Sequence, residues 1–456
     1  MSAPARPTGV REAPTMPGLP VLGSAADLRR RLLATQLRAL HELGDVVRFT
    51  AGPPGVRLVV HGVYAPEGVH HVLAAEAARY RKDNRFYAAL RDDLGDGLLT
   101  SQDGTWLRQR RFVQPLFTHA QVERYLPVMA AEAGALVERW RAPARTGEPV
   151  DLHRETTRLT LRVVGRVLLG ADLDDAVPLV RTALPVIGEH VRRRGFAPLP
   201  VPAGWPTPAN LRARHERRRV EALVDRLTAA RRADAGDRGD LLGRLVAARD
   251  GGAGLSDAEV RDQVVVFLFA GHDTTATALT AALHLLGAHP AEQERAHEEA
   301  RGLPDVPSRA DLDRLDHLTA VLKEALRLYP PAYATSRRRS GGDDVVGGYR
   351  IPDGTDVAVY PWVTHRHPRH WDDPERFAPR RFAPEREAAR HRYAWFPFGG
   401  GPRACIGGHF ALLESLVVLG AVLRAYRVET PDRPIPVRPR VTLRPAAPVP
   451  CRLTPR

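Results

Sequence analysis

One short segment carries the residues best suited to chemistry. Residues 396–410 read FPFGGGPRACIGGHF and include one of only two cysteines among 456 residues. The apolar, proline-free pattern after Cys405 predicts a helix that begins just beyond it. The dipole and free N–H groups of that helix would stabilise an anion, and Arg403 adds positive charge. We therefore expect the pKa of the Cys405 thiol to be lowered, so that the loop holds a thiolate.

A thiolate in this loop could act as a nucleophile, a zinc ligand or a haem ligand. A zinc site needs three or four ligands at defined spacing, and no C-x-x-C partner is present. A nucleophile usually has a base nearby, but His409 would point away from the loop on the following helix. The loop also lacks the GK[ST] ending of a phosphate-binding loop. The simplest alternative to a site is a tight turn around a buried cysteine.

The loop resembles a known cofactor site. Residues 398–407, FGGGPRACIG, fit the pattern F-x-x-G-x-R-x-C-x-G through Phe398, Gly401, Arg403, Cys405 and Gly407. This resembles the haem-binding loop of the cytochrome P450 family. The resemblance implies that Cys405 is the axial thiolate of haem b iron and that Arg403 pairs with a haem propionate. Such a thiolate donates electron density to the iron and favours O–O cleavage.

A second motif lies in the middle of the longest expected helix. A capping box begins this helix at Ser256, and its apolar pattern continues to about residue 286. Residues 270–275 read AGHDTT, and polar residues in an apolar helix are costly unless they are used or satisfied by a buried network. The stretch is similar to the family's A-G-x-D/E-T-T. By that match, Asp273 and Thr274 relay protons to bound dioxygen.

The same helix is expected to present one face to the cofactor. Val266, Ala270 and Thr274 recur every four residues and therefore share a face. Ala270 and Gly271 are expected to border the cofactor. Glycine at 271 lets a ligand approach the backbone, and the Thr274 hydroxyl can bond within the helix.

Three further motifs match the family in the correct order. Trp106 and Arg110 lie at i and i+4 in SQDGTWLRQRRFVQP, a spacing that is otherwise typical of a basic surface turn. The family match implies that both contact a haem propionate, and that Arg337 in PPAYATSRRRS does so too. Glu324 and Arg327 in KEALRLYPP would commonly be a solvated helix pair. By resemblance they form a buried structural trio with Arg376 of DDPERFAPRRF.

Substrate contacts can be assigned only by position relative to these motifs. Segments before the Trp106 helix, within the central helix and after the residue 323–331 motif are expected to surround the pocket. The expected pocket residues are Phe86, Tyr87, Leu98, Val266, Phe269, Tyr333 and Ala334. These residues favour an apolar substrate of the terpenoid, fatty acyl or polyketide class. The chain resembles soluble actinobacterial-type members of the family, which often serve secondary metabolism, and this resemblance implies terpene oxidation.

Composition and periodicity bound the architecture. Strand patterns at 46–52 and 56–62 predict a hairpin, helical patterns fill 64–330 except for a long loop at 196–212, and strands return at 345–361. We expect a mainly α protein with a small β lobe. The resemblance implies the P450 prism, with haem between the central helix and the helix after the cysteine loop. Residues 1–456 would form a single haem domain, of which 1–20 are a flexible segment.

The net charge of +14 invites a nucleic-acid interpretation, which the composition disfavours. Of 67 basic residues only Lys82 and Lys323 are lysines, and the arginines are spread along the chain beside 53 acids. Codon usage explains this pattern better than a nucleic-acid surface. The longest apolar run is far below the roughly 18 residues that span a bilayer, and no signal sequence is visible. We expect a cytoplasmic protein without a membrane anchor or a nucleic-acid partner.

The resemblance implies a haem-thiolate monooxygenase that inserts one atom of O2 into an apolar small molecule by hydroxylation or epoxidation. No flavin or nicotinamide motif is present, so electrons would come from a ferredoxin and an NAD(P)H-linked ferredoxin reductase. Exposed Arg108 and Arg111 are expected to attract the acidic ferredoxin. One alternative is a peroxide-driven peroxygenase, which would not need the Asp273–Thr274 relay. The other is a non-catalytic haem-based ligand binder or sensor.

Overall fold

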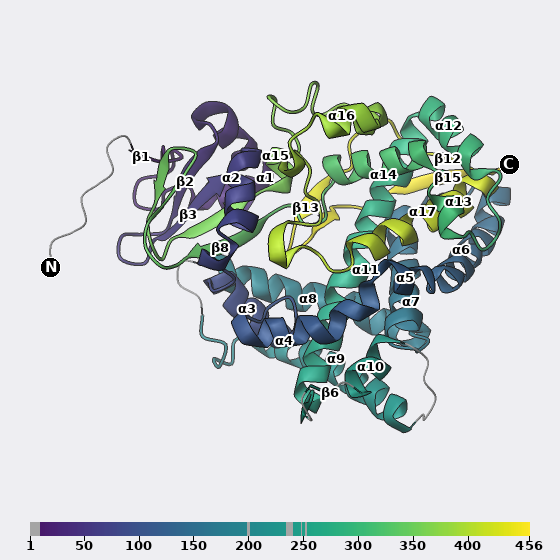
Figure 1. The fold of residues 1–456 in the computed structure, drawn as a ribbon, viewed down its shortest axis with the longest axis horizontal. Helices are drawn as coiled ribbons and strands as arrows, with labels where there is room; N and C mark the ends of the chain where they lie inside the picture. The colour runs from purple at the N-terminus through teal and green to yellow at the C-terminus, as the bar shows by residue number, and fades with distance from the viewer. Residues whose placement is uncertain (1–9, 198–200, 234–239, 248, 251–252) are drawn as a thin grey trace.

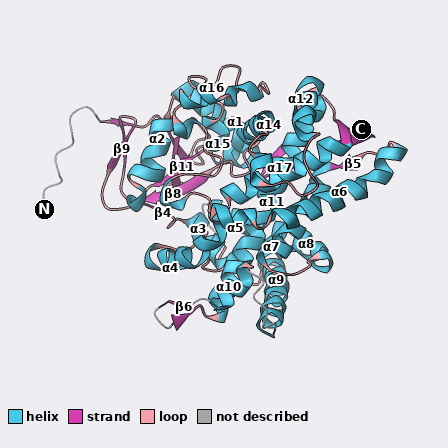
Figure 2. Ribbon diagram, turned by 45° about the vertical axis from the view of Figure 1, so that its right-hand side comes forward, coloured by secondary structure: helices cyan, strands magenta, loops and turns pink. Residues whose placement is uncertain are grey.

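Helices make up most of the chain, and a five-stranded sheet lies on the side of the N-terminus (Figures 1 and 2). The computed structural model describes residues 10–197, 201–233, 240–247, 249–250 and 253–456. The α-helices are α1 Ala25–Leu43, α2 Pro66–His70, α3 Arg85–Leu94, α4 Asp103–Val113, α5 His119–Glu123, α6 Leu126–Thr146, α7 Leu152–Leu168, α8 Val177–Phe196, α9 Pro208–Ala233, α10 Leu241–Ala247, α11 Asp257–Ala288, α12 Pro290–Ala300, α13 Arg309–Leu312, α14 Asp316–Leu328, α15 Pro361–Thr364, α16 Pro384–Ala388 and α17 Gly408–Ala425.

The strands form small sheets drawn from distant parts of the chain. Their bounds are β1 Arg11–Glu12, β2 Val46–Ala51, β3 Leu58–Val63, β4 Tyr80–Arg81, β5 Val150–Asp151, β6 Arg249–Asp250, β7 Ala253–Gly254, β8 Thr335–Arg339, β9 Asp344–Val346, β10 Tyr349–Ile351, β11 Asp356–Val359, β12 Tyr426–Glu429, β13 Val437–Pro439, β14 Leu443–Pro445 and β15 Pro450–Pro455. The largest sheet has the order β2-β3-β11-β8-β4. The expected hairpin is confirmed, because β2 and β3 pair antiparallel, and β9, β10 and β11 occupy the expected strand region.

The N-terminal segment departs from expectation. Residues 10–20 were expected to be flexible, but β1 pairs with β10, and Thr15 forms a bridge to Arg48 of β2. Met16 is buried against the sheet. The expectation of flexibility is therefore wrong for residues 10–20, because apolar side chains anchor a proline-rich segment to the sheet edge. Residues 1–9 lie outside the described residues.

The central helix α11 crosses the molecule and is the main support of the core (Figure 1). Ser256 and Glu259 form the expected capping box, and the helix ends before His289. It packs on α7, α14 and α17 within the largest hydrophobic cluster. Among the described residues, α11 and α17 are long and apolar enough to cross a membrane, but most of each apolar window is buried inside this fold.

The long loop expected at 196–212 is shorter in the structure. Helix α8 continues to Phe196 and α9 begins at Pro208. Residues 198–200 within this connection lie outside the described residues. The side chain of Asn210 donates to the carbonyls of Pro202 and Trp205, which fixes the second half of the connection to the first turn of α9.

Candidate functional site

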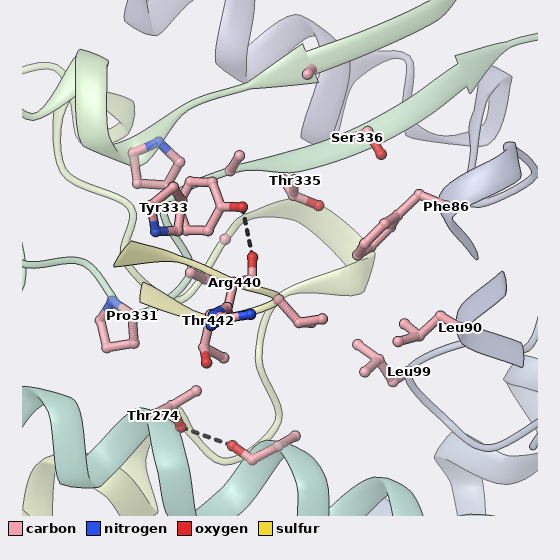
Figure 3. A pocket seen from close by; sticks show the side chains of 18 of the residues that line it. Phe86, Leu90, Leu99, Thr274, Pro331, Tyr333, Thr335, Ser336, Arg440 and Thr442 are labelled. Atoms are coloured by element: carbon pink, nitrogen blue, oxygen red, sulfur yellow. Dashed lines mark hydrogen bonds between the residues drawn. The ribbon is translucent and has the colours of Figure 1, made fainter. Parts of the chain in front are cut away.

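One cavity of about 1590 Å³ lies between α11, the cysteine loop and the large sheet. It is lined by Cys405 and its loop, and also by residues of α1, α8 and the β13–β14 hairpin. Figure 3 shows part of it, where Thr274 on α11 lies below Arg440 and Thr442, and where Phe86, Leu90 and Leu99 form another wall. The cavity is far larger than packing defects, so it is a binding site.

Cys405 lies one turn before α17, as expected, and its side chain faces the cavity. Its N–H donates to the carbonyl of Phe398 at 2.8 Å. The expectation of a lowered thiol pKa is wrong for the protein alone. The Cys405 side chain is exposed to the cavity. Desolvation by the protein packed around it raises the pKa of its thiol above the usual value, although the Gly407 N–H and the charges of Lys82 and Arg110 act in the opposite direction. A stable thiolate here therefore requires a cation at the sulfur.

Glycine is required where the cysteine loop turns. Gly401 has φ +63°, and a Cβ at this position would lie 1.8 Å from the carbonyl oxygen of Leu73. Any side chain would therefore displace the loop from the 71–75 segment against which it packs. Phe398 and Gly407 both line the cavity beside Cys405.

Four cations surround the inner end of the cavity, which is the end formed by the cysteine loop. They are Lys82, Arg110, Arg337 and Arg403. The guanidinium of Arg403 lies 4.1 Å from the centroid of the Trp106 ring, and that of Arg110 lies 5.5 Å from it. The four form no ion pair with any described residue. Nη1 of Arg403 is buried without any hydrogen-bond partner.

Burial makes these cations costly. It lowers the pKa of Lys82 to about 8 and that of Arg403 to about 10. Burial would raise the pKa of Tyr87, but Lys82 and Arg337 outweigh it and lower that pKa to about 8. Arg337 donates to the hydroxyls of Tyr87 and Thr335. The cluster is therefore short of negative charge.

The donor set fits haem b. The sulfur at one wall could serve as a ligand to the haem iron, and the unpaired buried cations beside it would suit two propionates. Sequence reasoning found Trp106, Arg110, Arg337 and Arg403, all of which line this end. It missed Lys82 entirely and assigned Tyr87 only to the substrate pocket. Lys82 carried a signal, because it is one of two lysines in an arginine-rich chain.

The central helix presents the expected face to the cavity. Val266, Ala270, Gly271 and Thr274 all line it. The Thr274 hydroxyl donates to the Ala270 carbonyl at 2.8 Å (Figure 3). A Cβ on Gly271 would lie 3.2 Å from the side chain of Val164, so glycine also permits close packing with α7.

Asp273 is buried but does not line the cavity. Its carboxylate accepts from the Thr442 hydroxyl and from Nε of Arg444 at 2.9 Å. Burial acts to raise the pKa of Asp273, but Arg444, His272 and Thr442 outweigh it, so the pKa is lowered. The partners come from the β13–β14 hairpin, about 170 residues later in the chain. Thr442 lines the cavity and thus separates it from Asp273.

The structural trio contains a different third arginine from the one expected. Arg327 and Glu324 are fully buried and form two hydrogen bonds of 2.6 and 2.8 Å. Arg376 is exposed and contributes only its carbonyl, which accepts from Arg327. Arg381 lies 3.4 Å from Glu324 and is buried. The choice of Arg376 is therefore wrong, because the chain turns at Pro379 and directs Arg381 inward.

The apolar wall includes every residue expected there. Phe86, Tyr87, Leu98, Val266, Phe269, Tyr333 and Ala334 line the cavity. The Tyr333 hydroxyl donates to the main-chain carbonyl of Arg440, which joins the wall to the β13–β14 hairpin (Figure 3). Contact of these residues with a substrate stays a prediction. Sequence reasoning missed the contributions of α1 and of this hairpin, which carry no motif.

Comparison with known proteins gives a consistent result. A family model described as Cytochrome P450 matches residues 14–449. Cyclooctatin synthase of Streptomyces melanosporofaciens is 37% identical over 432 residues, which cover 93% of this chain and 91% of that protein. Pentalenene oxygenase of Streptomyces avermitilis is 35% identical over 440 residues, with 95% and 94% covered. Cyclooctat-9-en-7-ol 5-monooxygenase of Streptomyces melanosporofaciens is 34% identical over 443 residues, with 95% and 93% covered.

Proposed function

The chain belongs to the cytochrome P450 family, and we propose that it oxygenates a terpenoid. It is a haem-thiolate monooxygenase that uses haem b, O2 and electrons from redox partners. The observation that carries the choice of substrate is the similarity to relatives named for cyclooctatin and pentalenene, over more than nine-tenths of the chain. The apolar wall of the cavity supports it, since a terpenoid skeleton offers few hydrogen bonds.

The inner end of the cavity would hold the cofactor. When bound, haem b supplies the dioxygen-binding and redox chemistry of the reaction. Cys405 is proposed as its axial ligand, and Lys82, Arg110, Arg337 and Arg403 as the cations that neutralise its propionates. These cations would keep the propionates at the cavity wall and leave the middle of the cavity to the substrate.

Thr274 and Asp273 are proposed to deliver protons to the reacting end of the cavity. The Thr274 hydroxyl is at the cavity wall and bonds only within its own helix, so it can turn toward a ligand. Asp273 is held ionised behind the wall by Arg444 and Thr442. For Asp273 to pass a proton to the cavity, the Thr442 contact must open, since this hydroxyl lies between them.

A ferredoxin is the proposed electron donor, and its docking surface differs from the one expected. Arg108 pairs with Glu259, so part of its charge is neutralised. Arg111 and Arg124 are exposed and unpaired among the described residues. The rings of His119 and His409 lie 4.2 Å apart, which brings α5 against the first turn of α17 beside Cys405. Arg111 and Arg124 therefore offer positive charge close to the cysteine loop.

The cytoplasm is the proposed location. Both cysteines are free, as in a reducing compartment, and separate redox proteins could reach the enzyme there.

Substrate class can be tested by screening cyclic terpenes, fatty acids and polyketides for the haem absorbance change that follows water displacement. Compounds that bind are then incubated with a surrogate ferredoxin, its reductase and NADPH. The proposal expects terpenes to bind and to gain one oxygen atom, seen by mass spectrometry. A cavity that binds only fatty acids or polyketides contradicts the terpenoid assignment. Binding of every substrate without turnover would favour a ligand sensor.

Replacement of Thr274 by Ala tests the proton assignment. The variant should still bind haem and substrate, while product formed per NADPH falls by roughly tenfold because reducing equivalents are lost as peroxide. An unchanged ratio removes Thr274 from proton delivery. The peroxygenase would be favoured if the Thr274→Ala variant formed as much product with added peroxide as the wild type forms with NADPH.

A further inference from the structure

Besides Arg110, Arg337 and Arg403, seven arginines line the cavity, and five of the seven are exposed, so they lie where the cavity opens to solvent. We call them the mouth arginines. They come from three elements that are far apart in the sequence, namely α1, the last turns of α8, and the β13–β14 hairpin with its turn. The members are Arg29, Arg30, Arg31, Arg192, Arg193, Arg438 and Arg440. All line the same continuous cavity that Cys405 lines. The mouth arginines therefore lie on the path between solvent and the reacting end.

A break in α1 helps to bring three of them together. Arg31 has φ −139° and ψ 41°, which is not helical, so the helix kinks at this residue. Consecutive residues on a regular α-helix point about 100° apart and cannot all face one cavity. With the kink, Arg29, Arg30 and Arg31 all contribute to the cavity lining. Three consecutive arginines of α1 thus contribute to the lining of one hollow.

Most of this positive charge has no partner. Glu189 pairs with both Arg192 and Arg440. The other five mouth arginines are exposed and form no ion pair or side-chain hydrogen bond with any described residue; these are Arg29, Arg30, Arg31, Arg193 and Arg438. Glu189 and the partly buried Asp356 are the acids among the described residues that line the cavity.

Codon usage does not explain this arrangement. A preference for arginine codons adds arginines, but it does not remove acids from one region. The chain as a whole carries 53 acids beside 67 basic residues. Among the cavity-lining residues of the three mouth elements, one acid, Glu189, accompanies seven arginines. The other acids of α1, Asp27 and Glu42, do not line the cavity and pair with Arg38. Five unpaired cations at the opening of an otherwise apolar cavity create a strong positive potential there.

We propose that the mouth arginines bind the negatively charged end of the substrate, a carboxylate or a phosphate on an amphiphile whose apolar body lies in the inner cavity. This inference rests on the proposed function and narrows it, from a terpenoid to an anionic terpenoid. The head group would remain beside Arg193 and Arg438, and the far end of the skeleton would reach toward Thr274. The arginines then select the substrate and fix which end faces the reacting centre.

The test uses three probes that share one C20 isoprenoid chain: geranylgeraniol, geranylgeranoic acid and geranylgeranyl monophosphate. Their affinities for the holoenzyme are measured at low and at high salt, both by haem absorbance and by equilibrium dialysis. At low salt the acid or the phosphate should bind at least about tenfold more tightly than the alcohol. High salt should shrink the preference, since the arginines are exposed. The stronger of the two anions identifies the head group.

A matched pair of triple variants assigns the preference to the mouth. The first carries Arg29→Glu, Arg193→Glu and Arg438→Glu, and it should lose the preference while alcohol binding is kept. The control carries Arg218→Glu, Arg226→Glu and Arg452→Glu, which make the same charge change at exposed arginines outside the cavity. The control should keep the preference. Retained haem absorbance in both variants shows that they fold.

Two outcomes overturn the inference: anions that bind no better than the alcohol, or a preference that both triple variants retain. If the anions bind no better than geranylgeraniol but geranylgeraniol or a cyclic terpene is oxygenated, the inference fails and the proposed terpenoid oxygenation stands. If the anions bind through the arginines but no probe or cyclic terpene is oxygenated, the inference stands and the proposed function fails.

Discussion

The two ends of the cavity are both rich in positive charge, but they hold it in different ways. At the inner end, Lys82, Arg337 and Arg403 are partly or fully buried, and burial lowers the pKa of Lys82 and of Arg403. At the mouth, Arg30 and Arg193 are exposed to solvent. Buried charge is expensive without a partner, whereas exposed charge costs little. The inner cations therefore need a permanent anion, a role proposed for the haem propionates, whereas the exposed cations at the mouth are suited to an anion that binds only transiently.

The largest predicted effect is a loss of stability when the buried Glu324–Arg327 pair is broken. Arg327→Ala would leave Glu324 buried without its main partner, and this should cost about 3–5 kcal/mol of stability. Arg381→Ala should cost less, since its distance to Glu324 is 3.4 Å. Arg376→Ala should stay within about 0.5 kcal/mol, because this side chain is exposed. Denaturant unfolding of the three holoproteins measures the order of their free energies of unfolding. A large loss of stability in Arg376→Ala would contradict the assignment of Arg381.

Replacement of Arg403 tests whether the cations at the inner end of the cavity bind an anion. Arg403→Ala removes a cation that has an unpaired buried nitrogen, so a propionate would lose a charge-assisted bond of about 2 kcal/mol. Haem affinity should fall by roughly 30-fold, measured by transfer of haem to apomyoglobin. Arg452→Ala is the exposed control. Equal haem loss from the two variants would place the propionates elsewhere.

Glu414 shows what the same interior does to an acid without a partner. It is fully buried on α17, neither carboxylate oxygen has a hydrogen-bond partner in the described part of the chain, and burial raises its pKa well above 4.5. The folded state thus keeps a proton that the unfolded state releases above about pH 4.5. The free energy of unfolding should therefore fall as the pH rises above about 4.5, by about 1.4 kcal/mol per pH unit. Glu414→Gln should abolish this contribution to the pH dependence of stability. Denaturant titrations from pH 4.5 upward measure it, and equal slopes would mean that Glu414 is ionised.

The sequence predicts the residues of the inner end better than those of the mouth, and the reason is physical. The inner end rests on residues at fixed local spacing, such as Trp106 with Arg110, so pattern and resemblance could select residues that line the same cavity as Cys405. Their contact with a haem propionate stays a prediction. The mouth depends on a kink at Arg31 and on convergence of three distant elements, which no local pattern encodes. The choice of Arg376 over Arg381 failed because side-chain direction depends on a turn that spacing alone does not define.

The smallest expected effect concerns the docking surface beside the cysteine loop. Arg111→Glu with Arg124→Glu should slow reduction by an acidic ferredoxin severalfold at low ionic strength. The difference should vanish near 1 M salt, where the Debye length is about 3 Å. Arg218→Glu with Arg226→Glu on α9 is the matched control. Stopped-flow reduction rates across a salt series decide, and equal slowing by both pairs would indicate a general charge effect.

The central claim is that Cys405 ligates the haem at the inner end. The most direct measurement is the absorbance spectrum of the reduced carbon monoxide complex for the wild type, Cys405→His and Cys451→Ser. The strongly red-shifted Soret band of thiolate-ligated haem should be present in the wild type and in Cys451→Ser, and absent in Cys405→His. A Cys405→His protein that keeps this band, or a Cys451→Ser protein that loses it, contradicts the account.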